Sequence, residues 1–144
     1  MKTKLILAAA ISTVFLCGTA SARDSVTTLP LADIIGTDKA KSALLDVPFY
    51  FAGQKHAKVT STWGDVSTNK KTNAVGKSDA EACQWVLLSA IKALQEAATK
   101  RGYDAVVNIR SNYKNNEFTS ATEFQCGAGS IMAGVALKGE LVKF

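Results

Sequence analysis

The chain has 144 residues and a formal net charge of +5 at pH 7, and 47% of its residues are hydrophobic. A chain of this length is enough for one domain of ordinary size, which buries about two-thirds of the surface of its unfolded state. The charge is modest and forms no long run, so the composition argues against a nucleic-acid-binding protein.

Residues 1–22 have the pattern of a secretory signal peptide. Lys2 and Lys4 precede a short apolar run over residues 5–18, and Ala20-Ser21-Ala22 is an A-x-A cleavage signature. The apolar run is too short and wrongly flanked for a membrane-spanning helix. We therefore expect export and cleavage after Ala22.

Cleavage would leave a single mature domain, residues 23–144, in the periplasm or outside the cell. Without the two leader lysines it has 15 basic and 12 acidic residues, a net charge of +3. Leu16 and Phe15 precede Cys17, whereas a lipid-attachment cysteine follows a small residue, so we expect no lipid anchor.

The first part of the mature chain is mixed in pattern. Leu31–Ile35 follows a proline and could form a short helix, and Lys39–Leu45 could form another helical turn. Val47–Ala52 is apolar and aromatic, and Val59–Trp63 alternates with polar residues in a strand that can continue to Thr68. A turn at Gly53-Gln54 lies between these two segments, so we predict a β-hairpin.

A long helix is predicted over Asp79–Arg101. Ser78 and Glu81 form a capping box at its start, and Gly102 is placed to end it. One apolar face repeats at helical spacing: Cys83, Val86, Leu87, Ala90, Leu94 and Ala97. Polar residues are expected mostly away from that face: Lys92, Gln95, Glu96, Thr99 and Lys100.

Strand patterns follow the helix. Residues 105–113 alternate as in a half-buried strand, with Ala105, Val107 and Ile109 on one face. Lys114–Ser120 reads as a polar loop, and Phe124–Leu137 as the last long strand region. Small residues in that region would let a helix approach closely: Gly127, Ala128, Gly129, Ala133, Gly134 and Ala136.

Two cysteines, Cys83 and Cys126, remain after Cys17 leaves with the leader. An oxidising compartment favours a disulfide between them, although a buried free pair and a catalytic thiol are alternatives. A bridge closing a loop of 43 residues would stabilise the fold by about 4 kcal/mol in the chain-entropy model. It would also attach the first turn of the helix to the strand of small residues.

Gly76-Lys77-Ser78 matches the last three residues of a nucleotide-binding P-loop. The position of the first P-loop glycine holds Lys71, and the preceding segment is polar rather than a buried strand. We therefore interpret Ser78 as a helix cap and Gly76 as a turn residue. The free N–H groups of a helix start could still bind an anion or a partner, with Lys70, Lys71, Lys77 and Ser78 as the candidate contacts.

No catalytic or metal-binding constellation is evident. His56 is the only histidine and stands in a polar turn, which is typical of a surface residue. Zinc needs three or four ligands, and no motif surrounds a nucleophilic serine, so we expect neither a cofactor nor catalysis. Five aromatic residues could line a pocket but are expected mainly in the core: Phe49, Tyr50, Phe51, Trp63 and Trp85.

Two long segments carry a resemblance to a known family. "SDAEACQWVLLSAIKALQEAATKRGYDAVVNI" and "FQCGAGSIMAGVALKG" resemble small exported bacterial proteins, some of which bear the label "excinuclease ATPase subunit". More remotely, the same segments are similar to YbjQ-type domains and to the envelope stress sensor RcsF. The resemblance implies a single α+β domain with one long helix packed on a mostly antiparallel sheet.

The resemblance to RcsF extends to the cysteines and stops short of a full match. Cys83 and Cys126 match one of its two bridges, whereas Ser111 and Met132 stand at the positions of the other, and the lipid-attachment cysteine is missing. YbjQ-type domains imply that assembly of several copies into a homo-oligomer is an option.

These observations favour a non-catalytic exported domain that binds an envelope or extracellular protein, or serves as an accessory to stress sensing. A fully secreted effector or a protein that binds an anionic ligand or lipid head group is one alternative. A hydrolase whose site is assembled from distant residues is another.

Overall fold

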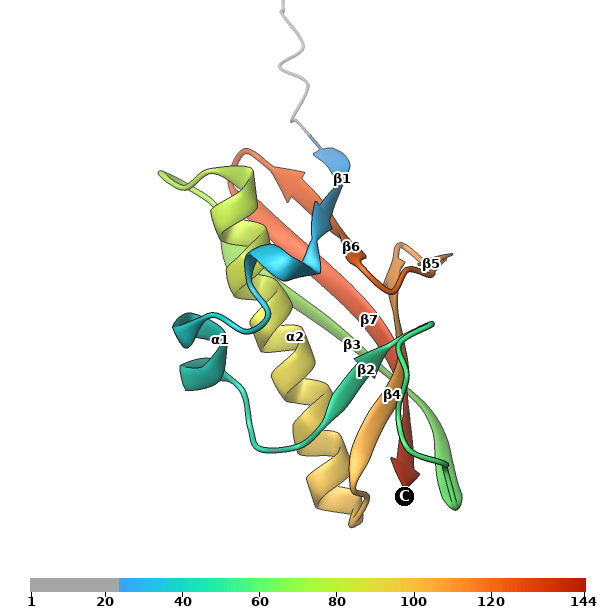
Figure 1. The fold of residues 1–144 in the computed structure, drawn as a ribbon. Coiled ribbons are helices and arrows are strands. Elements are labelled where there is room, and N and C mark those ends of the chain that lie inside the picture. Colours follow the sequence, from blue (N-terminus) through green and yellow to red (C-terminus); the bar gives the residue numbers. More distant parts are fainter. Residues whose placement is uncertain (1–23) are drawn as a thin grey trace, which may run out of the picture.

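The computed structural model describes residues 24–144 (Figure 1). The predicted signal peptide, residues 1–22 with cleavage after Ala22, lies outside the described residues. The described chain forms the elements β1 (Asp24–Pro30), η1 (Leu31–Asp33), α1 (Asp38–Ala43), β2 (Phe49–Phe51), β3 (Ser61–Asn73), α2 (Asp79–Arg101), β4 (Ala105–Tyr113), β5 (Asn116–Phe118), β6 (Glu123–Gly129) and β7 (Met132–Lys143). The fold is α+β, with α2 packed on one face of a curled, mostly antiparallel sheet (Figure 1).

Helix α2 has the predicted bounds because its local signals agree. Ser78 caps its start, acidic side chains occupy its first turn and basic ones its last turn. Both placements complement the helix dipole. Gly102 ends the helix with φ of 73°, the left-handed conformation that glycine adopts without a steric cost.

Strand β7 is the centre of the sheet. Along one edge it pairs with β3 over nearly its full length, and along the other it pairs first with β6 and then with β4. Strand β1 extends the sheet beyond β6, and β2 runs parallel to β4. The sheet therefore divides into two branches on one side of β7, which gives it its curl (Figure 1).

The predicted hairpin of Val47–Ala52 with Val59–Thr68 is wrong. Strand β2 pairs with β4 and β3 pairs with β7, so two strands separate the predicted partners. The predicted turn at Gly53-Gln54 is present, with Gln54 N–H donating to the Phe51 carbonyl at 3.0 Å, but it does not bring the two strands together. Alternation of side chains predicts a strand but carries no information about its partner.

Two further segments differ from the expected elements. Phe124–Leu137 is not one strand, because the chain reverses after Gly129 and returns as β7. The predicted loop Lys114–Ser120 includes the short strand β5, which forms a hairpin with β4. Lys114 and Asn115 supply positive φ angles of 52° and 62° at its turn, as tight hairpin turns require.

A β-bulge interrupts the alternation of β4. The pairing with β7 shifts register between Val107 and Arg110, and Asn108 between them has φ of 50°. The extra residue turns Ile109 onto the same side as Val106, in the main core under α2. Ala105 and Val107 belong instead to a small second cluster, so the predicted common face of residues 105, 107 and 109 is wrong.

The small residues of β6 and β7 divide between the two faces of the sheet. Ala128 and Ala133 lie in the main core with α2, in agreement with a close helix approach. Gly127 and Gly134 instead form a cross-strand pair on the opposite face, which we call the outer face. There the ring of Tyr113 covers Gly127 and would collide with a Cβ atom at that position.

Gln95 is the largest exception to the predicted polar face of α2. Its side chain is fully buried and its amide bonds to the segment that precedes β2. Oε1 accepts from the Leu45 N–H at 2.9 Å, and Nε2 donates to the carbonyls of Leu45 and Val47 at 2.9 and 2.8 Å. The side-chain amide of Gln95 thus makes the hydrogen bonds that a neighbouring strand would make, and it attaches this irregular segment to the helix.

Candidate functional site

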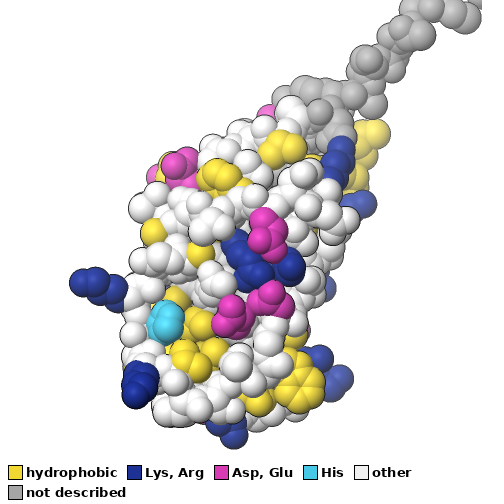
Figure 2. Space-filling view, turned by 90° about the vertical axis from the view of Figure 1, so that its right-hand side faces the viewer, with side chains coloured by type: hydrophobic (Ala, Val, Ile, Leu, Met, Phe, Trp, Pro, Cys, Tyr) yellow, Lys and Arg dark blue, Asp and Glu magenta, His cyan; other side chains and the backbone are white. Residues whose placement is uncertain are grey.

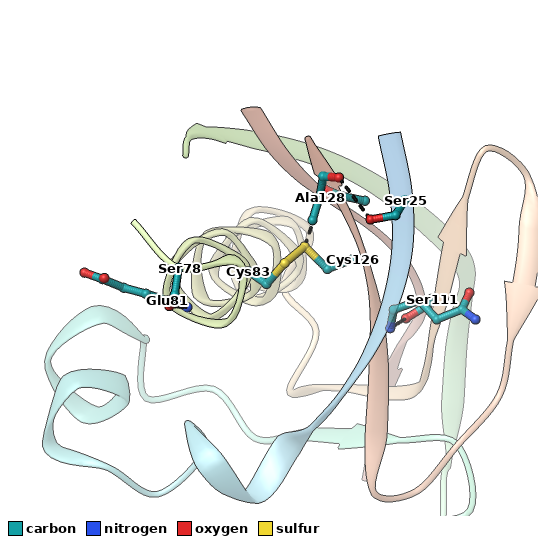
Figure 3. The surroundings of a disulfide bond; sticks show 9 residues. Ser25, Ser78, Glu81, Cys83, Ser111, Cys126 and Ala128 are labelled. Atoms are coloured by element: carbon teal, nitrogen blue, oxygen red, sulfur yellow. Dashed lines mark hydrogen bonds between the residues drawn. A yellow bond between two sulfur atoms is a disulfide. The ribbon is translucent and has the colours of Figure 1, made fainter. Parts of the chain in front are cut away.

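Cys83 and Cys126 form the predicted disulfide. The bond joins the first turn of α2 to β6, with a Cα–Cα separation of 5.9 Å, and both residues are fully buried (Figure 3). While the bond is formed, neither sulfur can act as a nucleophile or a thiolate ligand. The buried hydroxyl of Ser111 accepts from the Gln125 N–H at 2.9 Å, which ties β4 to β6.

The Gly-Lys-Ser step has a structural role at the start of α2. The Ser78 hydroxyl accepts from the Glu81 N–H at 3.1 Å (Figure 3). Gly76 has φ of 74° in the preceding turn, and Lys77 Nζ donates to the Asn73 carbonyl at 3.0 Å. These contacts account for all three residues without a nucleotide.

Replacing Ser78 by alanine should lower the free energy of unfolding by about 1 kcal/mol, because the cap of α2 is lost. Urea unfolding followed by circular dichroism measures the change. Ser89→Ala is the matched control, since Ser89 is exposed within the same helix and bonds only to the Trp85 carbonyl one turn earlier. An equal effect of both substitutions would contradict a capping role.

The candidate lysines lie at one end of the molecule. Lys70 and Lys71 are exposed on β3, opposite Val135 and Gly134, and Lys77 is exposed in the loop before α2. We call these three residues the tip lysines. Lys70 and Lys71 are neighbours on one strand, so their side chains point to opposite faces of the sheet. Whether the tip lysines bind an anion stays a prediction.

Exposed apolar side chains lie beside the tip lysines. Val75 is 61% exposed, Ile131 66% and Met132 45%, and we call these three residues the apolar tip. Val75 lies in the loop after β3, Ile131 in the turn before β7, and Met132 is the first residue of β7. A hydrogen bond of 2.7 Å from Ala74 N–H to the Ile131 carbonyl joins the loop to the turn. The loop and the turn lie at the end of the sheet where β1 begins (Figure 1).

The sequence interpretation missed the apolar tip because it treated Phe124–Leu137 as one strand. A turn within that segment places Ile131 and Met132 at an end of the molecule, whereas a continuous strand would place them against its neighbours. Gly129-Ser130 was the available signal, since such pairs are common in turns.

A row of paired charges crosses the outer face. Arg110 donates to both carboxylate oxygens of Asp65, at 3.3 and 2.6 Å, and its Nε lies 3.4 Å from Glu117. Lys138 Nζ lies 3.0 Å from the same Glu117 oxygen. We call these four residues the charged row; charged side chains of both signs are visible together in Figure 2.

The charged row keeps its carboxylates ionised. The hydrogen bond from Arg110 lowers the pKa of Asp65, and the bond from Lys138 is the main cause that lowers the pKa of Glu117. Asp65 in turn raises the pKa of Arg110. The four charges balance one another, so the row has no net charge to offer a ligand.

His56 is exposed but packs against aromatic rings. Its ring centroid lies 5.5 Å from that of Tyr50 and 6.0 Å from that of Phe144, and Nδ1 lies 2.8 Å from the Ala57 carbonyl. Among the other aromatic residues, Phe51 is buried as expected. Trp63 and Trp85 are 57% and 43% exposed, so the expectation of a core position is wrong for them.

The two tryptophans instead pair with cations. Lys39 Nζ lies 3.7 Å from the centroid of the Trp85 ring, and the guanidinium of Arg101 lies 5.3 Å from that of Trp63. Cation–π contacts of this kind let a large aromatic ring remain at the surface.

Over residues 24–144, no cluster of three or more His, Cys, Asp or Glu side chains could hold a metal ion. In the same range, none of the helices combines the length and apolar character needed to cross a membrane. Models of protein families, curated proteins and solved structures were compared with the chain, and no match was found in any of the three.

Proposed function

We propose that this protein is a non-catalytic binding domain, exported to the cell envelope, that docks on an acidic membrane surface through the apolar tip and the tip lysines. The observation that carries the proposal is the position of three exposed apolar side chains beside three exposed lysines at one end of the molecule. The resemblance to an envelope stress sensor supports an accessory or sensing role.

The apolar tip and the tip lysines match the two regions of an acidic bilayer surface, the acyl chains and the charged head groups. Val75, Ile131 and Met132 can enter the boundary between head groups and acyl chains, where burial of apolar area is favourable. Each lysine near an acidic surface contributes about 1 kcal/mol, and this attraction weakens as salt increases.

Two acidic residues follow Lys77 closely in sequence and reduce the net positive charge at this end of the molecule. Asp79 and Glu81 lie in the first turn of α2, where their charges complement the positive end of the helix dipole. Lys70 and Lys71 stand on β3, and Lys77 stands in the loop between β3 and α2.

The triple substitution Lys70→Gln, Lys71→Gln and Lys77→Gln should weaken binding to acidic vesicles about 100-fold, since about 3 kcal/mol of attraction is lost. Co-sedimentation of the oxidised protein with phosphatidylcholine vesicles containing 30% phosphatidylglycerol measures this, with pure phosphatidylcholine for comparison. Val75→Ser with Ile131→Ser should weaken binding at every salt concentration.

The matched control is Lys55→Gln, Lys58→Gln and Lys100→Gln, which removes the same charge from exposed sites outside the tip. Equal losses in the two triple variants would mean that net charge, and not the tip, causes binding. Absence of any binding to acidic vesicles would refute docking on lipid. If a pull-down instead recovered a protein whose binding is lost in the Val75→Ser/Ile131→Ser variant, that protein would be the partner of the tip.

A further inference from the structure

A second candidate site lies on the outer face, beyond the charged row. A pocket of about 400 Å³ opens between the segment that joins β2 to β3 and the strands β4 and β7. Its lining includes Phe51, His56, Val59, Val107, Asn108 and Glu140. In Figure 2 the histidine and acidic side chains border hydrophobic side chains on this face.

Glu140 carries the one carboxylate in the pocket lining, and over residues 24–144 it is found in no ion pair. One of its oxygens accepts from Asn108 Nδ2 at 3.1 Å. Among residues 24–144 the neighbouring cations, Arg110 and Lys138, form their ion pairs with Asp65 and Glu117 instead. A partly buried carboxylate without a cation favours a positively charged ligand.

Asn108 holds Glu140 in place and is itself fixed in an uncommon conformation. Its φ of 50° belongs to the left-handed region, which is uncommon for residues other than glycine. Arg110 Nη1 donates to its carbonyl at 3.0 Å, while its side chain bonds to Glu140. Bulges of this kind are over-represented next to active sites.

The rest of the pocket combines apolar surface with a further acceptor. Val107 belongs to the second hydrophobic cluster, and Val59 packs against it. When Nδ1 of His56 donates to the Ala57 carbonyl, Nε2 is the acceptor nitrogen of the neutral ring. The pocket thus offers acceptors and apolar contacts, which suits a donor with a hydrocarbon stem.

We infer that this pocket binds an alkylammonium group, with the charged nitrogen at Glu140 and the hydrocarbon stem against Val59 and Val107. A lysine side chain and the end of an aliphatic diamine both have this chemistry. The inference is independent of membrane docking, because none of the pocket residues belongs to the tip.

The test is a titration of the oxidised protein with n-pentylammonium, followed by amide NMR shifts, with 1-pentanol as the uncharged analogue. Saturable shifts at Val107, Asn108 and Glu140 are expected with the ammonium, at least tenfold stronger than with the alcohol. Glu140→Gln keeps the shape and an acceptor for Asn108, and should weaken ammonium binding about tenfold, as expected when a charge-assisted contact becomes neutral.

Glu123→Gln is the matched control, since it removes an exposed carboxylate of β6 that takes no part in the ion pairs of Arg110 and Lys138. It should leave ammonium binding unchanged. The inference is overturned by equal affinity for ammonium and alcohol, by equal effects of the two glutamine variants, or by no saturable shift in a wild-type protein whose spectrum is that of the folded state.

Discussion

The double variant Cys83→Ala/Cys126→Ala should lose about 4 kcal/mol of its free energy of unfolding. Without the bond, the unfolded chain is no longer closed into a loop of 43 residues, and the gain in its conformational entropy favours unfolding by this amount. A loss of this size is comparable with the whole net stability of a small domain. The variant is therefore expected to be partly unfolded at 37 °C. Urea unfolding monitored by tryptophan fluorescence measures the change.

The control for the double variant is to repeat the unfolding measurement of both proteins with a reductant present. Wild-type protein should lose stability when the disulfide is reduced, whereas the variant should not respond. Two titratable thiols in natively purified wild-type protein would show that the bond does not form in the cell, and would remove the support that it lends to export.

Replacing Gln95 by alanine should cost about 3 kcal/mol, because three hydrogen bonds are lost and buried backbone groups are left without partners. The segment of Leu45 to Val47 should then detach from α2, since the amide is its hydrogen-bonded link to the helix. Amide hydrogen exchange in that segment should become faster than in the strands of the sheet.

Glu96→Ala is the control for Gln95→Ala, since Glu96 is the next residue of the same helix and is exposed. Its effect should stay within about 0.5 kcal/mol. Gln95→Glu keeps the size of the side chain but removes its two donated bonds, so it should destabilise the protein about as much as alanine. A neutral effect of either Gln95 variant would mean that water replaces the amide contacts.

The elements that local signals specify were predictable. Helix α2 begins after Ser78 and ends at Gly102, as its cap and its terminating glycine indicate. The cysteine pair followed from the expected compartment and from the absence of any other cysteine in the mature chain. The helix-on-sheet architecture was expected from the resemblance, and the structure has it.

Part of the candidate site was also predictable. The closeness of Lys70, Lys71 and Lys77 in sequence puts them at one end of the molecule, whereas the strand directs Lys70 and Lys71 to opposite faces of the sheet. The apolar tip needs Ile131 beside Val75, an approach of two loops 56 residues apart that no local pattern encodes. The pocket needs three separate segments to meet at Glu140, for which the sequence holds no motif.

By itself, the sequence determined the helix, its caps and the positions of several strands, because those features depend on residues within a few positions of one another. It also determined the cysteine pair, because the predicted mature chain holds only two cysteines. Only the tertiary structure decided which strands pair, that Gln95 is buried, and that the bulge at Asn108 turns Ile109 towards the helix. These outcomes depend on contacts between distant segments, where packing and the need to satisfy buried hydrogen bonds outweigh local preference.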